Sequence, residues 1–133
     1  MVISVVAAIA VVAGAVPASA GTGLCNSGYA CGYDHLSYDG AVFGTAQNTS
    51  NWGRQGFANR ATSVSVNGRT CKYTTFHTSW SAWTNLPSGD SFRLNSRQLL
   101  GTSYRDPDLR NGAGTSPGRS FDDKIMATQF SGC

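Results

Sequence analysis

The sequence contains no glutamate and only two lysines, so it lacks most of the charged residues that favour helices. Glycine, serine, threonine, asparagine and aromatic residues are abundant instead, and these residues favour turns and strands. The composition therefore predicts an all-β protein and argues against a helical bundle.

Charge is also scarce. Ten basic residues and seven aspartates give a net charge of +3, and the basic residues are scattered without forming a run or a stripe. Nucleic-acid-binding domains concentrate Lys and Arg on one face. We therefore expect no nucleic acid partner.

No long hydrophobic run occurs beyond the first 20 residues. Residues 1–20, "MVISVVAAIAVVAGAVPASA", are uncharged and apolar and end in the small residues that a signal peptidase requires. A membrane anchor is the alternative, but the apolar run is shorter than the roughly 20 residues of a spanning helix. We expect residues 1–20 to be an export signal, although no basic residue precedes the run, and residues 21–133 to form one secreted, monomeric domain outside the membrane.

The four cysteines, Cys25, Cys31, Cys71 and Cys133, include no closely spaced C-x2-C pair of the kind that binds zinc. An even number of cysteines behind an export signal indicates two disulfides, for which three pairings are possible. Of these we expect Cys25–Cys31 and Cys71–Cys133.

Alternation of apolar and polar residues predicts several strands and tight turns. Turns are expected at Asp39-Gly40, at Asn67-Gly68 and at residues 87–90, and residues 95–120 show no sustained period and are expected to form a long exposed loop. The strands expected on this basis cover residues 29–33, 41–47, 61–66, 69–76, 82–86, 91–94 and 124–130.

The two halves of the chain echo each other. Tyr38 can be aligned with Trp80, and Phe57 with Phe121, so that each half reads as a hairpin, a connection, a turn led by phenylalanine and a strand. This order is typical of two Greek keys packed as a sandwich.

The spacing of Tyr33, Tyr38 and Gly40 fits the folded-hairpin motif of βγ-crystallin domains. With "CNSGYACGY" before it and "FANRATSV" after it, the sequence resembles the secreted bacterial βγ-crystallin-like proteins grouped as metalloproteinase-type peptidase inhibitors. The second copy of the motif departs from the pattern at Thr75 and Ala82. The resemblance implies a βγ-crystallin-like sandwich of two Greek keys and an extracellular peptidase as partner.

The stretch "YDHLSYDG" supplies the residue types of a catalytic triad in Asp34, His35, Ser37 and Asp39. A triad needs a buried partner for its base and an oxyanion hole beside its nucleophile, which neighbours in one hairpin do not provide. Adjacent side chains on a strand also point to opposite faces, so Asp34 and His35 should diverge. We expect no catalytic residues and a solvated hairpin tip.

The resemblance also raises calcium, because family members with a site hold Ca2+ between a hairpin loop and a turn rich in acids and hydroxyls. Residues 58–63 and 122–127 are the corresponding turns, and each has lost part of the pattern. The remaining candidates are Asn59, Thr62, Asp122 and Asp123. No cofactor is expected unless these residues bind calcium, in which case a calcium-stabilised binding or structural module is the alternative function.

An inhibitor would act by inserting a rigid loop into a peptidase cleft. The candidates are the second hairpin, residues 77–83 with His77 and Trp80, and the region 95–120 with Leu99, Leu100 and Tyr104. The short local disulfide that clamps the reactive loop in the family's best-understood inhibitor has no counterpart here. Trp52, Trp80 and Trp83 are expected to serve as core and hairpin cover, with a sugar-stacking platform as the alternative, and a small secreted toxin is a further alternative function.

Overall fold

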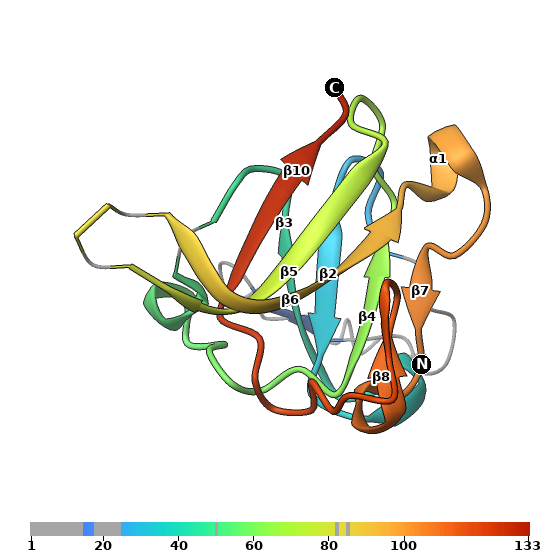
Figure 1. The fold of residues 1–133 in the computed structure, drawn as a ribbon. Coiled ribbons are helices and arrows are strands. Elements are labelled where there is room, and N and C mark those ends of the chain that lie inside the picture. The colour runs from blue at the N-terminus through green and yellow to red at the C-terminus, as the bar shows by residue number, and fades with distance from the viewer. Residues whose placement is uncertain (1–14, 18–24, 50, 82, 85) are drawn as a thin grey trace, which may run out of the picture.

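The structure is a computed structural model that describes residues 15–17, 25–49, 51–81, 83–84 and 86–133. Its regular structure is almost entirely β (Figure 1). The helical elements are short and are α1 (Arg97–Leu100), η1 (Leu36–Tyr38), η2 (Trp52–Gln55) and η3 (Leu109–Asn111). The strands are β1 (Ala15–Pro17), β2 (Ala30–Tyr33), β3 (Ala41–Thr45), β4 (Ser63–Val66), β5 (Tyr73–Trp80), β6 (Pro87–Asn95), β7 (Arg105–Asp106), β8 (Gly112–Ala113), β9 (Ser116–Pro117) and β10 (Ala127–Ser131).

The strands form two main antiparallel sheets with the orders β1-β3-β2-β4-β7 and β10-β5-β6, and β8 pairs with β9 in a small hairpin. The first half of the chain supplies β2, β3 and β4, and the second supplies β5, β6 and β10. Each half also contributes a short segment to the sheet of the other, because β7 pairs with β4 and Thr49 bridges to Thr128 on β10. The predicted all-β sandwich of two Greek keys is confirmed.

The core lies between the sheets and is mainly aromatic. The ring of Trp52 lies 4.9 Å from that of Phe43, and the Phe76 and Phe92 rings stack at 5.0 Å. Gly32 on β2 makes room for the indole, because a Cβ there would lie 2.8 Å from a Trp52 ring carbon. The two Greek keys are therefore joined through the side chains of both sheets.

The phenylalanine-led turns repeat in three dimensions as they do in the sequence. Phe57 and Phe121 are both buried. Two residues after each, Asn59 and Asp123 adopt positive φ angles of 56° and 53°. The Asn59 amide donates to the Ile125 carbonyl at 2.9 Å, and the Asp123 amide donates to the Ala61 carbonyl at 3.0 Å. The two turns thus bind each other reciprocally across the middle of the molecule.

Three local predictions are wrong. Asn67-Gly68 is not a hairpin turn, since β4 and β5 belong to different sheets and neither residue has a positive φ. The turn predicted at residues 87–90 lies earlier, because β6 begins at Pro87. The predicted loop 95–120 contains α1, β7, η3, β8 and β9. Partners distant in sequence, which local patterns do not reveal, place β4 and β5 in different sheets and pair β7 with β4. The displaced turn and the β8–β9 hairpin are instead errors in the expected local pairing, since Trp80 pairs with Pro87 and Gly112 pairs with Pro117.

Of the predicted export signal, residues 1–20, the structure describes Ala15–Pro17. These residues form β1, which pairs with β3 at the edge of the larger sheet. The predicted cleavage point after residue 20 lies outside the described residues. In the part of the chain that is described, no helix is long and apolar enough to cross a membrane.

Candidate functional site

The connection between β5 and β6 projects beyond the rest of the molecule at the left of Figure 1. Trp83 in this connection is 98% exposed, and Leu86 is 58% exposed. We call the described residues of the connection, Ser81, Trp83, Thr84 and Leu86, the hairpin apex. An indole fully in water offers nearly all of its apolar surface to a partner, and tryptophan is enriched among the residues that dominate binding energy.

Hydrogen bonds hold the apex on its two strands. The Ser81 amide donates to the Leu86 carbonyl at 2.8 Å, and the Thr84 amide donates to the Ser81 hydroxyl at 3.3 Å. Just below, the hydroxyls of Ser79 and Ser88 lie 3.0 Å apart across the strand pair. The apex is therefore closed by its own backbone and small polar side chains.

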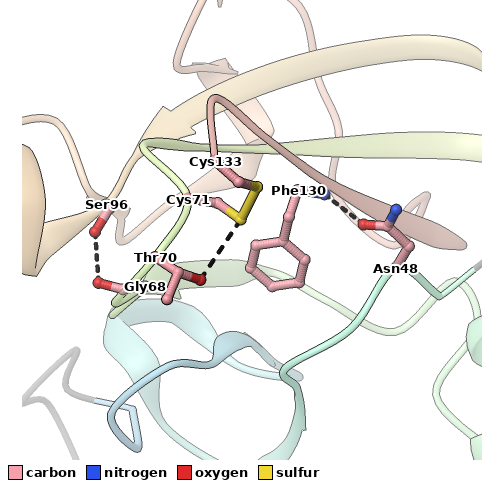
Figure 2. Close-up of a disulfide and its surroundings, with 7 residues drawn as sticks. All are labelled: Asn48, Gly68, Thr70, Cys71, Ser96, Phe130 and Cys133. Atoms are coloured by element: carbon pink, nitrogen blue, oxygen red, sulfur yellow. Dashed lines mark hydrogen bonds between the residues drawn. A yellow bond between two sulfur atoms is a disulfide. The ribbon is translucent and has the colours of Figure 1, made fainter.

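The disulfide lies at the other end of β5. Cys71, just before β5, is bonded to Cys133, just after β10 (Figure 2). The Phe130 amide on β10 also donates to the Asn48 side chain at 2.7 Å. The Cys71–Cys133 bond forms as predicted, and it fastens the base of the hairpin rather than its apex.

The predicted second hairpin, residues 77–83, is placed differently from expectation. His77 lies inside β5, opposite Ala127 and Ser91, and is not a tip residue. Trp80 is the last residue of β5 and is partly buried. Trp83, predicted to cover the core or the hairpin, is instead the exposed apex residue. The cause of the error is the displaced turn: with the turn assigned to residues 87–90, Trp83 was counted as a strand residue.

His77 should make stability depend on pH. Burial lowers the pKa of its imidazole below the usual 6.5, and neighbouring Gln129 opposes this shift less strongly. The unfolded chain therefore binds a proton more readily than the folded one, so stability is complete above pH 6.5 and falls as the pH drops from 6.5 toward the lowered folded pKa.

Urea unfolding at a series of pH values measures this effect. The wild type should lose stability below pH 6.5, and His77→Gln should flatten that slope. His35→Gln is the matched control, because it removes the other histidine from a position that is 69% exposed. An identical slope in the His77 variant would contradict the assignment.

Leu99 and Leu100 lie on α1, and Tyr104 lies a few residues after it. Leu99 and Leu100 are 44% and 39% exposed on α1, and the hydroxyl of Ser96, the residue just before α1, accepts a hydrogen bond from the Leu99 amide. The Arg97 guanidinium lies 5.8 Å from the ring centre of Tyr104. Figure 1 places α1 on the opposite side of the molecule from the hairpin apex. The two predicted groups of inhibitory residues therefore do not form one surface.

The stretch "YDHLSYDG" forms the end of β2, η1 and the turn into β3. Tyr33 and Tyr38 are buried with their rings edge to face at 5.7 Å, and burial raises the pKa of Tyr38 to about 12. Asp34 and His35 do not diverge as predicted: His35 Nε2 lies 3.7 Å from Asp34 Oδ1. The alternation of a strand does not apply to them, because β2 ends at Tyr33. Gly40 has a φ of 78°, and a Cβ there would collide with both side chains.

The predicted Cys25–Cys31 disulfide is absent, and both residues are free thiols. The Cys25 sulfur donates to the Tyr29 carbonyl at 3.1 Å. Cys31 is buried in β2, and a hydrogen bond with the Cys25 thiol together with burial raises the pKa of the Cys31 thiol. The two sulfurs therefore lie close together, as their spacing suggested, but no bond joins them in this structure.

Residues 18–82 match the sequence profile of peptidase inhibitor family I36. The match covers just under half of the chain and shows that this segment is similar to family I36. The matched residues contain the first Greek key and β5 and end just before Trp83, so most of the hairpin apex follows the family I36 segment. No curated protein matches the sequence.

Solved structures similar to this chain are βγ-crystallin domains. One, from work on the evolution of the eye lens βγ-crystallin domain fold, is 16% identical, has a TM-score of 0.58, and covers 83% of this chain and 94% of its own. A βγ-crystallin from Ciona intestinalis is 14% identical with a TM-score of 0.56, and the similarity covers 77% of this chain and 99% of that one. A βγ-crystallin from an archaeon is 14% identical with a TM-score of 0.53, and the similarity covers 79% of this chain and 99% of that one. The suspected resemblance to a βγ-crystallin-like peptidase inhibitor family is thus confirmed.

The calcium candidates of the two phenylalanine-led turns come together only in part. Thr62 hydrogen-bonds to the Asp123 carboxylate, whose pKa is raised by partial desolvation and by the charges of Asp122 and Asp34. Asp122 Oδ1 is buried and has no hydrogen-bond partner among the described residues. Asn59 uses its backbone to bind the opposite turn. Together the four side chains carry six oxygens, which is only the lower limit for Ca2+, and those of Thr62 and Asp123 already bond to each other.

The donor set therefore does not fit calcium. Met126 and Ala127 stand where the second turn would need hydroxyls, and Asp34 is already paired with Arg60 at 2.9 Å. Across residues 25–49, 51–81, 83–84 and 86–133, no group of three or more His, Cys, Asp or Glu side chains converges as a metal site.

Proposed function

We propose that this protein is a secreted inhibitor of extracellular metallopeptidases that inserts the hairpin apex into the substrate cleft of its target. The observation that supports this most directly is the 98% exposed Trp83 at the end of a projecting strand pair, in a chain that matches family I36. Inhibition in this form needs no catalytic residue.

The energetics favour an apex of this kind. A loop already held by hydrogen bonds loses little conformational freedom when it binds, so more of the contact energy appears as affinity. The Trp83 and Leu86 side chains would enter apolar pockets of the kind found in thermolysin-like peptidases, and burying two such side chains supplies several kcal/mol. The remaining contacts would come from extended backbone of the hairpin.

Replacing Trp83 with serine should weaken inhibition by about 100-fold or more, because a central tryptophan commonly contributes 2 kcal/mol or more to an interface. The inhibition constant would be measured by titrating the purified protein against a thermolysin-like and a subtilisin-like peptidase. Stability should not change, since Trp83 makes almost no contact with the core.

Leu99→Ser on α1 is the matched control. If the apex is the reactive surface, this variant inhibits like the wild type. Loss of inhibition in Leu99→Ser with full activity in Trp83→Ser would assign the reactive surface to α1 instead. If micromolar wild-type protein inhibits neither peptidase, the proposal is wrong.

We also propose that residues 1–20 direct export and are then cleaved, and that the mature protein acts as a monomer. The signal-like sequence of residues 1–20 supports the first point, and the interpretation of residues 21–133 as one small domain supports the second. N-terminal sequencing of the exported protein and size-exclusion chromatography with light scattering test them separately.

A further inference from the structure

Two hollows adjoin each other beside the C-terminal end of β3. The first has a volume of about 360 Å3 and reaches from β3 to η2, and the second has a volume of about 280 Å3 and lies beside the disulfide. Both are lined by Ala46 and Gln47, so they form one groove over the segment that follows β3. Ligand sites commonly occupy roughly 300–1,000 Å3. We call this surface, residues 44–49 with Tyr29, Gln55, Thr70 and Phe130, the polar groove.

The side chains that line the polar groove are uncharged. Gln47, Asn48 and Gln55 are exposed and carry amides, which both donate and accept hydrogen bonds. Thr70 adds an exposed hydroxyl. Among the described residues that line the groove, none is an aspartate, histidine, lysine or arginine. Such a lining fits a neutral ligand with many hydroxyls.

Tyr29 provides an aromatic wall in the first hollow. It lies just before β2 and is 37% exposed. Gly44 on β3 makes room for the ring, because a Cβ at Gly44 would lie 3.2 Å from Tyr29 Cδ2. An accessible aromatic ring can pack against the apolar C–H face of a sugar and leave the sugar hydroxyls to polar neighbours.

Phe130 provides a second ring in the other hollow. Figure 2 shows this ring between Asn48 and the Cys71–Cys133 bond. Phe130 is partly buried, and the hydrogen bond from its amide to the Asn48 side chain fixes both residues. The two parts of the groove therefore contain one aromatic ring each, which suits successive units of a chain better than a single small molecule.

The floor of the groove is held in shape by its own hydrogen bonds. The Gln47 carbonyl accepts hydrogen bonds from the hydroxyls of Thr45 and Thr49, at 2.9 and 3.0 Å. The backbone of Thr49 bridges to Thr128 on β10. A surface that is already ordered loses little conformational freedom when a ligand binds.

We propose that the polar groove binds a neutral oligosaccharide, with one sugar ring against Tyr29 and another against Phe130. The amides and the Thr70 hydroxyl would bind the sugar hydroxyls. The groove reaches the disulfide, at the end of β5 away from the hairpin apex. The proposal therefore concerns a separate surface and does not depend on inhibition of a peptidase.

Calorimetric titration of the full chain with three uncharged hexasaccharides, chitohexaose, cellohexaose and maltohexaose, tests the proposal. At least one should bind, and its affinity should be the same at low and high NaCl concentration, because no charged side chain takes part. An uncharged hexapeptide of glycine and serine, which represents a peptide occupant, should not bind. Failure of all three sugars at millimolar concentration, or equal binding of the peptide, would overturn the proposal.

Variants of two groove residues locate the site. Tyr29→Ala should weaken binding about 10-fold, whereas Tyr29→Phe keeps the ring and should stay within about threefold of the wild type. Gln55→Ala, at an exposed position, should weaken binding about fivefold through the loss of a neutral hydrogen bond. Melting temperatures would show that each variant is folded.

Trp83→Ala is the matched control, because it removes the exposed aromatic side chain of the hairpin apex. This variant should bind the sugar like the wild type. Unchanged binding in both Tyr29→Ala and Gln55→Ala would contradict the assignment. Loss of binding in Trp83→Ala alone would place the sugar at the apex instead and would also overturn it.

Discussion

Replacing Trp52 with alanine is expected to cost about 3–5 kcal/mol, which is a large part of the roughly 5–15 kcal/mol that stabilises a small domain. The indole is fully buried and lies within 6.2 Å of the Phe76 ring in the opposite sheet. Its Nε1 also donates to the Thr128 hydroxyl at 3.2 Å. Truncation would open a cavity between the two Greek keys and leave that hydroxyl without its donor.

The measurement is urea unfolding followed by tyrosine fluorescence and circular dichroism, since the variant loses one indole signal. Trp83→Ala removes the same side chain from a position that is 98% exposed and should change stability by less than about 0.5 kcal/mol. Equal losses in the two variants would show that Trp52 is not the side chain joining the sheets.

Replacing Cys71 and Cys133 with serine should cost about 4 kcal/mol, because the bond closes a loop with a sequence separation of 62. In the folded protein β10 remains paired with β5, but its end at Ser131 is then held only by hydrogen bonds. Hydrogen exchange should report faster opening of the Gln129 and Phe130 amides before the rest of the second sheet.

A reducing agent supplies the control for this prediction. It should lower the wild-type midpoint to that of the double-serine variant and leave the variant itself unchanged. A wild type that is insensitive to complete reduction would contradict a stabilising role for the bond. Cys25 and Cys31 are free thiols in the folded protein, so the reducing agent has no second disulfide to break and should cause no further loss of stability.

The parts of the fold that the sequence predicted are local. The spacing of Tyr33, Tyr38 and Gly40 identified the first hairpin, because one positive-φ glycine and two tyrosines decide its shape within a few residues. The repeat of Phe57 at Phe121 likewise identified two similar halves. Short-range conformational preferences and aromatic burial act in the same way wherever the segment lies in the fold.

The errors concern pairing between distant segments. β7 is two residues long and becomes a strand because Val64 and Ser65 on β4 provide its partners. No pattern within two residues can indicate this. The same holds for Asn67-Gly68, whose letters suit a tight turn but whose flanking strands are drawn into different sheets.

The sequence indicated the region of the candidate site, but not which residue is exposed there. Sequence reasoning indicated the second hairpin, and the structure moves its turn back so that Trp83 is exposed and His77 is enclosed in β5. The exposure of a tryptophan is decided by which residues its neighbours pair with, so the decisive feature of the site is a tertiary property.

By itself, the sequence determined the fold class and the two similar halves, because composition and short spacings reflect constraints that act along the chain. The cysteine count allowed three pairings, of which the structure contains the expected Cys71–Cys133 bond and not Cys25–Cys31. The tertiary structure alone decided the position of the apex, the thiol state of Cys25 and Cys31, and the pairing of Arg60 with Asp34. The Arg60–Asp34 pair depends on the approach of residues far apart in sequence, and that approach follows from how the two sheets bury their common aromatic core. The apex depends on the register of β5 with β6, and the two thiols depend on the geometry of residues 25–31, neither of which the sequence pattern specified.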